Sequence, residues 1–441
     1  MARMLNAGAR IALLAVVAGP AVGQVKTLPV PVSPPIRVSV SSAGVQGNDT
    51  SQHPKLSPDG RFVGFTSDAS NLVPGDTNGV ADAFVRDRML GTMTRVSVDS
   101  AGNQGNAIST TPSFSLDGRY ATFLSSASNL VAGDTNMAND IFVHDLWTRT
   151  TERVSLDSAG VQGDYHSSNS SLSADGRHVV FVSSATNLVP FDDPYYQSDV
   201  FVRDRATGIT TRVSVSSAGV KGNSGSTSAR ITPDGCTVAF MSLATNLVPQ
   251  DTNGFPDVFV HDRVSGTTER VSVGSSGAEG NARSLYPSLS SDSRYVAFSS
   301  HASNLVAQDT NGSVDIFVRD RINGTTTRVS VSSGGAEGNG DSDTPSISSD
   351  GRFVAFASYA SNLVPQDTNG TGDFFVHDRA TVTTKRVSIT SAGTQGAGDP
   401  YLDGIPVLSS RGHYVAFSST ADDLVPMDTN ARVDVFVRRL R

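Results

Sequence analysis

The tripeptide Arg-Val-Ser recurs along this chain at an almost constant spacing. Between two copies the same pieces return in the same order: a short apolar stretch, a turn of the type Ser-x-Asp-Gly-Arg, an aromatic strand, a long loop and another strand. A repeat of this length indicates an architecture in which each unit is one supersecondary structure that must pack against its neighbours. The seven copies begin at Arg37, Arg95, Arg153, Arg212, Arg270, Arg328 and Arg386, with separations of 58, 58, 59, 58, 58 and 58 residues.

Each unit predicts four antiparallel strands. In the first unit, residues 55–57 lead into Pro58-Asp59-Gly60, where Gly tolerates positive φ and Asp bonds to its own backbone, as in a hairpin turn. Strands are then expected at 61–67, 83–87 and 94–98. With 41 Gly and 20 Pro in 441 residues, long helices are not expected.

Seven such units predict an all-β, seven-bladed β-propeller over residues 36–441. A single four-stranded unit cannot bury both of its apolar faces, whereas a closed ring leaves no blade uncovered. The last unit stops at its third strand, within 434–441, and residues 36–40 form a fourth strand with no unit before it. We therefore expect strand 36–40 to join the last blade and close the ring.

The first residues have the pattern of a signal peptide, predicted at 1–23. Arg3 and Arg10 precede an apolar run at 11–18, and Ala21-Val22-Gly23 provides a cleavage pattern. Residues 24–35 are rich in Pro and predict an extended linker. The sequence thus predicts an exported protein, periplasmic or secreted, with no membrane span after cleavage.

Charge and cysteine content narrow the range of partners. The formal net charge of -8 argues against a nucleic-acid partner, because neutralising phosphates requires a basic surface. A single Cys excludes an internal disulfide framework. We expect a monomer whose partner is a protein or polysaccharide of the cell envelope or the exterior.

Two stretches carry a resemblance to a known family. Residues 56–63 (Leu-Ser-Pro-Asp-Gly-Arg-Phe-Val) and 347–356 (Ile-Ser-Ser-Asp-Gly-Arg-Phe-Val-Ala-Phe) resemble the WD40-like repeat of TolB-type propellers. The resemblance covers all seven units and implies the propeller fold. That repeat occurs in periplasmic interaction proteins, peptidase accessory domains and some polysaccharide lyases. Leader, linker and seven units account for every residue here, so functions of an attached hydrolase domain or of TolB's N-terminal domain are not expected.

Strand direction places the long loop before each third strand and the loop between blades at the same end of the ring, which we call the long-loop face. Binding residues usually collect on such loops. The motif Asp-Thr-Asn-Gly-x-x-Asp recurs there and has two interpretations: a calcium loop with hard oxygen ligands, or Asx-turns that satisfy loop amides. Its complete copies contain Asp76, Asn78 and Asp82; Asp251, Asn253 and Asp257; Asp309, Asn311 and Asp315; and Asp367, Asn369 and Asp373.

The third strands carry a cation at one repeated position, alternately Arg and His, and an Asp follows it in six of the seven copies. Metal binding is not expected, because equivalent positions on different blades lie too far apart to share an ion. Pairing with neighbouring Asp side chains is the favoured interpretation. The cations are Arg86, His144, Arg203, His261, Arg319, His377 and Arg438.

Two groups of residues break the repeat and are candidates for ligand binding. On the long-loop face, aromatic rings beside carboxylates suit sugar stacking or a protein contact, although loop drift explains them equally well. Around the axis, larger polar residues replace the commoner small ones, which suits a small anionic ligand or only a solvent-filled channel. The first group is Asp164, Tyr165, His166, Asp192, Tyr195, Tyr196 and Tyr401, and the second is His53, Lys55, Arg230 and Tyr286.

Enzyme signatures are absent from the sequence: it has no G-x-S-x-G elbow, H-E-x-x-H motif, P-loop or dinucleotide fingerprint. No catalytic residue is assigned, and a non-catalytic binding or scaffolding propeller is the favoured function. Two alternatives stay open. One is a carbohydrate-active enzyme, a polysaccharide lyase or hydrolase, with an axial cleft, and the other is a calcium-stabilised structural envelope protein.

Overall fold

The computed structural model describes residues 33–190, 196–398 and 405–441. The predicted signal peptide, most of the linker, and the candidate residues Asp192, Tyr195 and Tyr401 lie outside the described residues. Ser33–Arg441 is one compact unit, in which the described residues form strands, turns and loops. No helix that is long and apolar enough to cross a membrane occurs among them.

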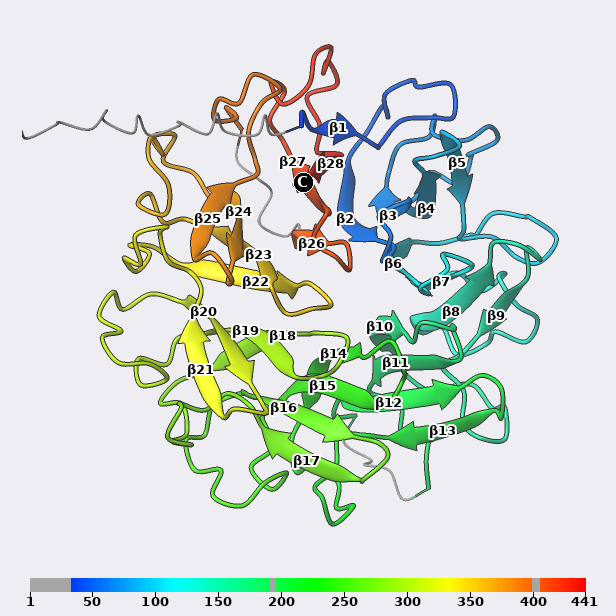
Figure 1. Cartoon of the computed structure of the whole chain (residues 1–441). Helices are drawn as coiled ribbons and strands as arrows, with labels where there is room; N and C mark the ends of the chain where they lie inside the picture. Colours follow the sequence, from blue (N-terminus) through cyan, green and yellow to red (C-terminus); the bar gives the residue numbers. More distant parts are fainter. Residues whose placement is uncertain (1–32, 191–195, 399–404) are drawn as a thin grey trace, which may run out of the picture. The chain divides into compact units, whose positions relative to one another are not determined.

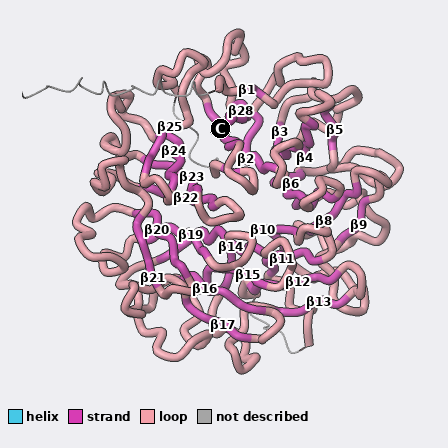
Figure 2. Tube along the Cα trace, viewed as in Figure 1, coloured by secondary structure: helices cyan, strands magenta, loops and turns pink. Residues whose placement is uncertain are grey.

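The strands form seven antiparallel sheets of four strands each, arranged as blades around a centre (Figure 1; Figure 2). In blades one to six the four strands follow one another in the chain. Blade one contains β2 (Ser51–Leu56), β3 (Phe62–Ser67), β4 (Asp82–Asp87) and β5 (Thr92–Arg95); blade two β6 (Ser109–Phe114), β7 (Tyr120–Ser125), β8 (Asp140–Asp145) and β9 (Thr151–Arg153); blade three β10 (Ser167–Leu172), β11 (His178–Ser183), β12 (Asp199–Asp204) and β13 (Ile209–Arg212). Blade four contains β14 (Ser226–Ile231), β15 (Thr237–Ser242), β16 (Asp257–Asp262) and β17 (Thr267–Arg270); blade five β18 (Ser284–Leu289), β19 (Tyr295–Ser300), β20 (Asp315–Asp320) and β21 (Thr325–Arg328); blade six β22 (Ser342–Ile347), β23 (Phe353–Ser358), β24 (Asp373–Asp378) and β25 (Thr383–Arg386).

Blade seven joins the two ends of the propeller, as the sequence predicts. It contains β26 (Val407–Leu408), β27 (Tyr414–Ser419), β28 (Asp434–Arg439) and β1 (Ile36–Arg37), in the order β1-β28-β27-β26. Strand β1 pairs antiparallel with β28, with Ile36 opposite Val437. Regular pairing is shorter than the predicted 36–40, although the Val38 amide still donates to the Val435 carbonyl at 2.8 Å.

The hydrophobic core is divided among the interfaces between blades. Seven clusters of buried side chains each combine residues of two neighbouring blades. One of them packs Val63 and Phe65 of blade one against Ala416 and Val435 of blade seven. Seven interfaces among seven blades are possible only when the ring is closed, so packing and strand pairing agree.

A buried carboxylate fastens this closure. Ser39 donates its hydroxyl hydrogen to Asp434 Oδ1 at 2.5 Å, and Arg37 Nη1 lies 3.4 Å from Asp434 Oδ2 and 3.1 Å from Asp428 Oδ1. Both serine and arginine come from the N-terminal segment, whereas both aspartates come from the last blade. The chain ends are therefore joined by side chains as well as by β1.

We predict that Asp434→Ala destabilises the whole ring. Removing one partner of a buried ion pair leaves the other uncompensated and costs about 3–5 kcal/mol. Urea unfolding should therefore show a lower midpoint. Asp422→Ala, at an exposed position of the same blade, is the control and should change stability little. Equal midpoints for the two variants would contradict the role of Asp434 in closure.

Candidate functional site

The Arg and the Ser of the Arg-Val-Ser motif both bind one aspartate, which explains why the motif recurs. In blade one, Arg95 Nη1 lies 3.1 Å from both Asp76 Oδ1 and Asp82 Oδ2. The Ser97 hydroxyl donates to Asp82 Oδ1 at 2.6 Å, and Val96 between them is buried in the core. The motif thus joins the fourth strand to the long loop and to the first residue of the third strand.

In three of the four complete Asp-Thr-Asn-Gly loops the asparagine presents its nitrogen, and not its oxygen, to this aspartate; in blade six Gln395 donates to Asp373 instead. Asn78 Nδ2 donates to Asp82 Oδ2 at 2.9 Å and to the Gly105 carbonyl at 3.0 Å, while Asn78 Oδ1 accepts from the Val80 amide at 3.3 Å. A guanidinium and an amide NH₂ therefore face the carboxylates that the calcium interpretation would use as ligands, and an ion would have to displace them. This geometry does not fit a calcium site and favours the Asx-turn interpretation.

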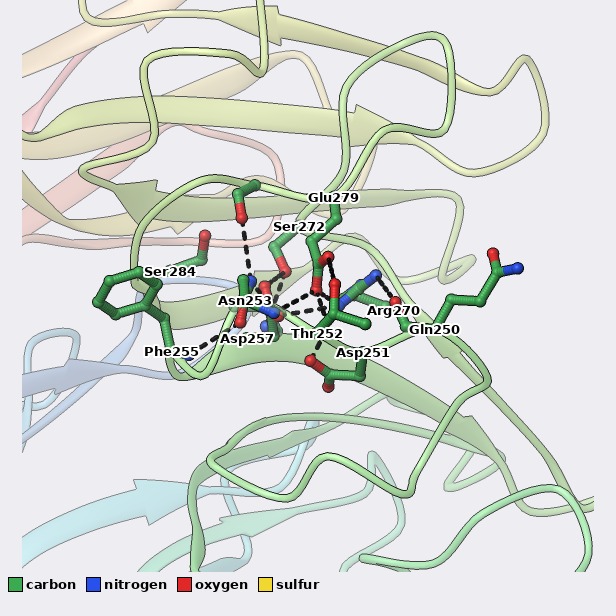
Figure 3. Close-up of polar contacts among 12 residues, drawn as sticks. Gln250, Asp251, Thr252, Asn253, Phe255, Asp257, Arg270, Ser272, Glu279 and Ser284 are labelled. Atoms are coloured by element: carbon green, nitrogen blue, oxygen red, sulfur yellow. Dashed lines mark hydrogen bonds and ion pairs between the residues drawn. The ribbon is translucent and has the colours of Figure 1, made fainter.

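Blade four has an extra carboxylate in the same place (Figure 3). Oxygens of Asp251, Asp257 and Glu279 lie within 4.8 Å of one another. Arg270 Nη1 contacts all three, at 3.2 Å, 3.1 Å and 2.7 Å respectively. Glu279 was not among the residues predicted from the sequence, although the repeat marks it: its position carries Gln in four of the seven loops, Gln46, Gln104, Gln162 and Gln395.

Burial and crowding shift the pKa values of this cluster in opposite directions. Burial raises the pKa of Asp251 to about 6, Arg270 opposes the shift, and Asp257 and Glu279 add to it. Burial also raises the pKa of Glu279, but hydrogen bonds from Thr252 and Arg270 outweigh it and leave the value at about 2. Hydrogen bonds from Thr252, followed by that from Arg270, thus keep Glu279 ionised.

The third-strand cations do not pair with the Asp beside them, which corrects the expectation from the sequence. Arg86 Nη1 donates to the carbonyls of Val40 and Ser41, at 3.3 Å and 2.9 Å, and Asp87 instead pairs with Arg61 of the neighbouring strand at 2.6 Å. Successive side chains of a strand point to opposite faces, so Arg86 and Asp87 cannot meet.

The histidines at this position are buried and neutral. The Thr151 hydroxyl donates to the Val98 carbonyl at 2.5 Å, so it must accept the hydrogen of His144 Nδ1, 2.9 Å away. Burial lowers the pKa of His144 to about 4, and the same holds for His377. These side chains attach each third strand to the loop that leads into its blade.

An aromatic cluster lies where blade three departs from the repeat. The ring of Tyr165 packs edge-on against His166, with centroids 4.7 Å apart, and lies 4.9 Å from Tyr196. Both tyrosines are exposed, by 43% and 54%. We call Tyr165, His166 and Tyr196 the blade three cluster.

Asp164, also predicted to bind a ligand, has a structural role in its loop. Its two carboxylate oxygens accept hydrogen bonds from the amide and the hydroxyl of Thr186, both at 2.6 Å. Other blades place Asn at this position, such as Asn106, which accepts from the Ser128 amide and donates its Nδ2 hydrogen to the Ser128 hydroxyl. Asp164 therefore has few acceptor sites left for a partner.

The four axial residues predicted from the sequence do come together at the centre of the ring. Lys55, Arg230 and Tyr286 line a cavity of about 180 Å³. His53 lines a second cavity of about 90 Å³, again with Lys55 and Arg230. The residues at the position of His53 in blades one to six are non-glycine residues with positive φ at β-bulges, a geometry that the sequence did not reveal: His53, Thr111, Asn169, Ser228, Tyr286 and Thr344.

Known structures share this architecture at low sequence identity. TolB from Acinetobacter baumannii is 16% identical to this chain, with a TM-score of 0.42. The match covers 76% of this chain and 62% of the TolB chain. An oligogalacturonate lyase in complex with manganese is 14% identical, with a TM-score of 0.55 and coverage of 93% of this chain and 97% of that one. The β-propeller domain of the Trilobed protease from Pyrococcus furiosus, which has an open velcro topology, is 11% identical, with a TM-score of 0.52 and coverage of 88% and 95%.

These likenesses show a fold. The chain is a seven-bladed β-propeller that is structurally similar to the propellers of the oligogalacturonate lyase and the Trilobed protease. No family model and no curated protein matches the sequence. Unlike the Trilobed protease domain, this ring is closed by β1 within the last blade.

We predict that calcium stabilises an Arg270→Ala variant but not the unaltered protein. Removing the guanidinium leaves three carboxylate groups facing one another, and an ion that binds only the native state raises the melting temperature. Thermal melts in chelator and in millimolar calcium measure the effect. Arg95→Ala, whose loop has Gln104 in place of Glu279, is the matched control and should respond less. A calcium response of the unaltered protein as large as that of Arg270→Ala would instead support calcium loops.

We predict that the buried histidines make the protein sensitive to acid. Because the folded pKa of His144 lies below the unfolded value of about 6.5, its stabilising contribution is complete above pH 6.5 and is lost as the pH falls towards 4, at about 1.4 kcal/mol per pKa unit. His144→Arg introduces the residue of blades one, three, five and seven. Its unfolding free energy should fall less between pH 6.5 and 4.5 than that of the unaltered protein. Parallel pH profiles would contradict this assignment.

Proposed function

We propose that this chain is an exported, non-catalytic binding propeller, periplasmic or secreted, that engages its partner on the long-loop face at the blade three cluster. Two facts support the proposal. The repeated polar motifs of the described blades are used in contacts within the ring, as for Arg95 with Asp76 and Asp82. The blade three cluster, in contrast, belongs to one blade and is exposed.

Tyr196 carries the proposal, through the exposed ring that its backbone presents. Its φ is 56°, in the left-handed region that disfavours side chains. The equivalent residue is a glycine with positive φ in four blades, Gly79, Gly254, Gly312 and Gly370. A bulky aromatic residue at this position costs stability. Met137 and Ala431 have the same conformation in blades two and seven, so the feature particular to blade three is the exposed tyrosine ring that this backbone presents beside Tyr165.

The chemistry of the cluster favours a polysaccharide as the partner. Tyrosine rings present an apolar face to sugar C–H groups while their hydroxyls stay in water. The loop next to them offers amides and hydroxyls, such as those of Asn139, whose backbone amide donates to His166 Nδ1, and of Ser126, which donates to Asn139 Oδ1. A protein partner usually buries a more apolar centre. A polysaccharide of the cell envelope or the exterior is thus the better match.

The axial cavities favour binding over catalysis. No Asp or Glu lines either cavity among the described residues. Hydrolysis of a glycosidic bond uses a pair of carboxyl groups on either side of the bond. The axial-cleft hydrolase alternative thus lacks its usual acid and base in the described lining.

We predict that Tyr196→Gly stabilises the fold and weakens partner binding. Relief of the left-handed conformation should raise the unfolding free energy by about 1 kcal/mol. Met137→Gly is the matched control, because Met137 occupies the same position in blade two with a φ of 55°. It should be stabilised similarly and keep binding. Thermal melts measure the first effect, and retention on immobilised envelope polysaccharides measures the second.

A second variant tests the stacking surface without altering the strained backbone. Tyr165→Ala introduces the residue found at the equivalent positions 107 and 282 of blades two and five. It should fold normally and lose retention on the polysaccharide that the unaltered protein binds. If Tyr165→Ala and Tyr196→Gly both bind as the unaltered protein does, the partner does not use the blade three cluster. Binding of a purified envelope protein, and of no polysaccharide, would overturn the choice of partner class.

A further inference from the structure

Two cations occupy a position on the axis where most blades have serine. Lys55 lies on β2 and Arg230 on β14, at equivalent places one residue before the end of each innermost strand. Both line the larger and the smaller axial cavity, so they lie where the two adjoin. The remaining blades carry Ser113, Ser171, Ser288, Ser346 and Val407 at this position.

The charges of Lys55 and Arg230 are not balanced by acidic groups. Among the described residues, no salt bridge includes either side chain, and no carboxylate lines either cavity. Arg230 Nη1 donates to the Ala229 carbonyl at 2.8 Å. Asp343, on the innermost strand β22, does not line either cavity, and its carboxylate accepts a hydrogen bond from the Thr344 amide. The axis therefore combines two positive groups with serine hydroxyls.

The two cations also act on each other. Burial and, to a smaller extent, the positive charge of Arg230 together lower the pKa of Lys55 to about 7. Burial also lowers the pKa of Arg230. Like charges placed together in a half-buried channel destabilise the protein unless an opposite charge joins them.

We propose that Lys55 and Arg230 bind a small oxyanion, a carboxylate or phosphate group of a low-molecular-mass solute, in the axial channel. The guanidinium matches the two oxygens of such a group, and the ammonium supplies a point charge. Serine hydroxyls of the same ring, such as Ser171 and Ser288, offer neutral donors. The cavity of about 180 Å³ limits the bound group to a small one. This site is separate from the blade three cluster and does not depend on the proposed function.

The repeat supplies the variants that test the site. Lys55→Ser and Arg230→Ser each introduce the residue that four other blades carry at this position, so both are expected to fold. In buffer without multivalent anions, both should melt at a higher temperature than the unaltered protein, because each removes one of two repelling charges. Citrate and inorganic phosphate are the probes for carboxylate and phosphate ligands, and sodium chloride at equal ionic strength is the control.

We expect citrate or phosphate to raise the melting temperature of the unaltered protein by several degrees and to leave both variants almost unchanged. Binding followed by calorimetry should weaken at least tenfold in each variant. A response to citrate alone would identify a carboxylate ligand, and one to phosphate alone would identify a phosphate ligand. Equal responses of the variants and the unaltered protein would show that the anions bind elsewhere, which would overturn the proposal.

An independent readout follows the ammonium itself. The chain has only four lysines, Lys26, Lys55, Lys221 and Lys385, so their signals after reductive ¹³C-methylation can be assigned by substitution. In the unaltered protein, a bound anion should raise the pKa of the Lys55 signal by about one unit or more and leave those of the other three unchanged. A Lys55 titration curve that saturating citrate and phosphate do not move would overturn the proposal even if the protein were stabilised.

Discussion

One buried carboxylate in each blade holds the propeller together. It belongs to the aspartate that begins the third strand, such as Asp82, and it accepts from the serine and pairs with the arginine of Arg-Val-Ser. This aspartate connects the long loop, the third strand and the fourth strand of its blade. In blade seven its partners Arg37 and Ser39 come from the other end of the chain, so the same interaction that orders a blade also closes the ring. An interaction that is local in six blades therefore also joins the two ends of the chain in blade seven.

The sequence predicts the fold well because the repeat is long and its period is regular. Blade number, strand order and closure by the N-terminal strand all follow from counting copies, and the structure confirms them. The partners of charged side chains are harder to predict, because strand pairing brings together residues far apart in sequence. Arg95 and Asp76 belong to two motifs that were interpreted separately, yet they form one ion pair. For Arg86 and Asp87 the alternation of a strand was sufficient to exclude pairing.

The candidate sites were predicted in part. The ring geometry brings Lys55, Arg230 and Tyr286 to the axis, as expected for residues of innermost strands. The β-bulge that turns His53 into the left-handed region has no signature in the sequence, since no glycine marks it. The strain at Tyr196 is visible only when its φ is compared with those of the equivalent glycines. The residue pattern therefore does not predict the local backbone geometry at these positions.

Because the blades are similar, the residues that the other blades carry at a position show which side chain the fold requires there. Serine is sufficient at the position of Lys55 in four blades, and glycine is sufficient at that of Tyr196 in four blades. Folding therefore gains nothing from a half-buried charge at the first position or from a strained aromatic ring at the second. Each departure lowers stability relative to the sibling blades, and the two lie in different parts of the ring, on the axis and on the long-loop face. On the axis, two like charges with no carboxylate in the described lining favour a bound anion. On the long-loop face Met137 shares the left-handed backbone, so it is the pair of exposed rings, Tyr165 and Tyr196, that favours a second binding surface over drift of the loops.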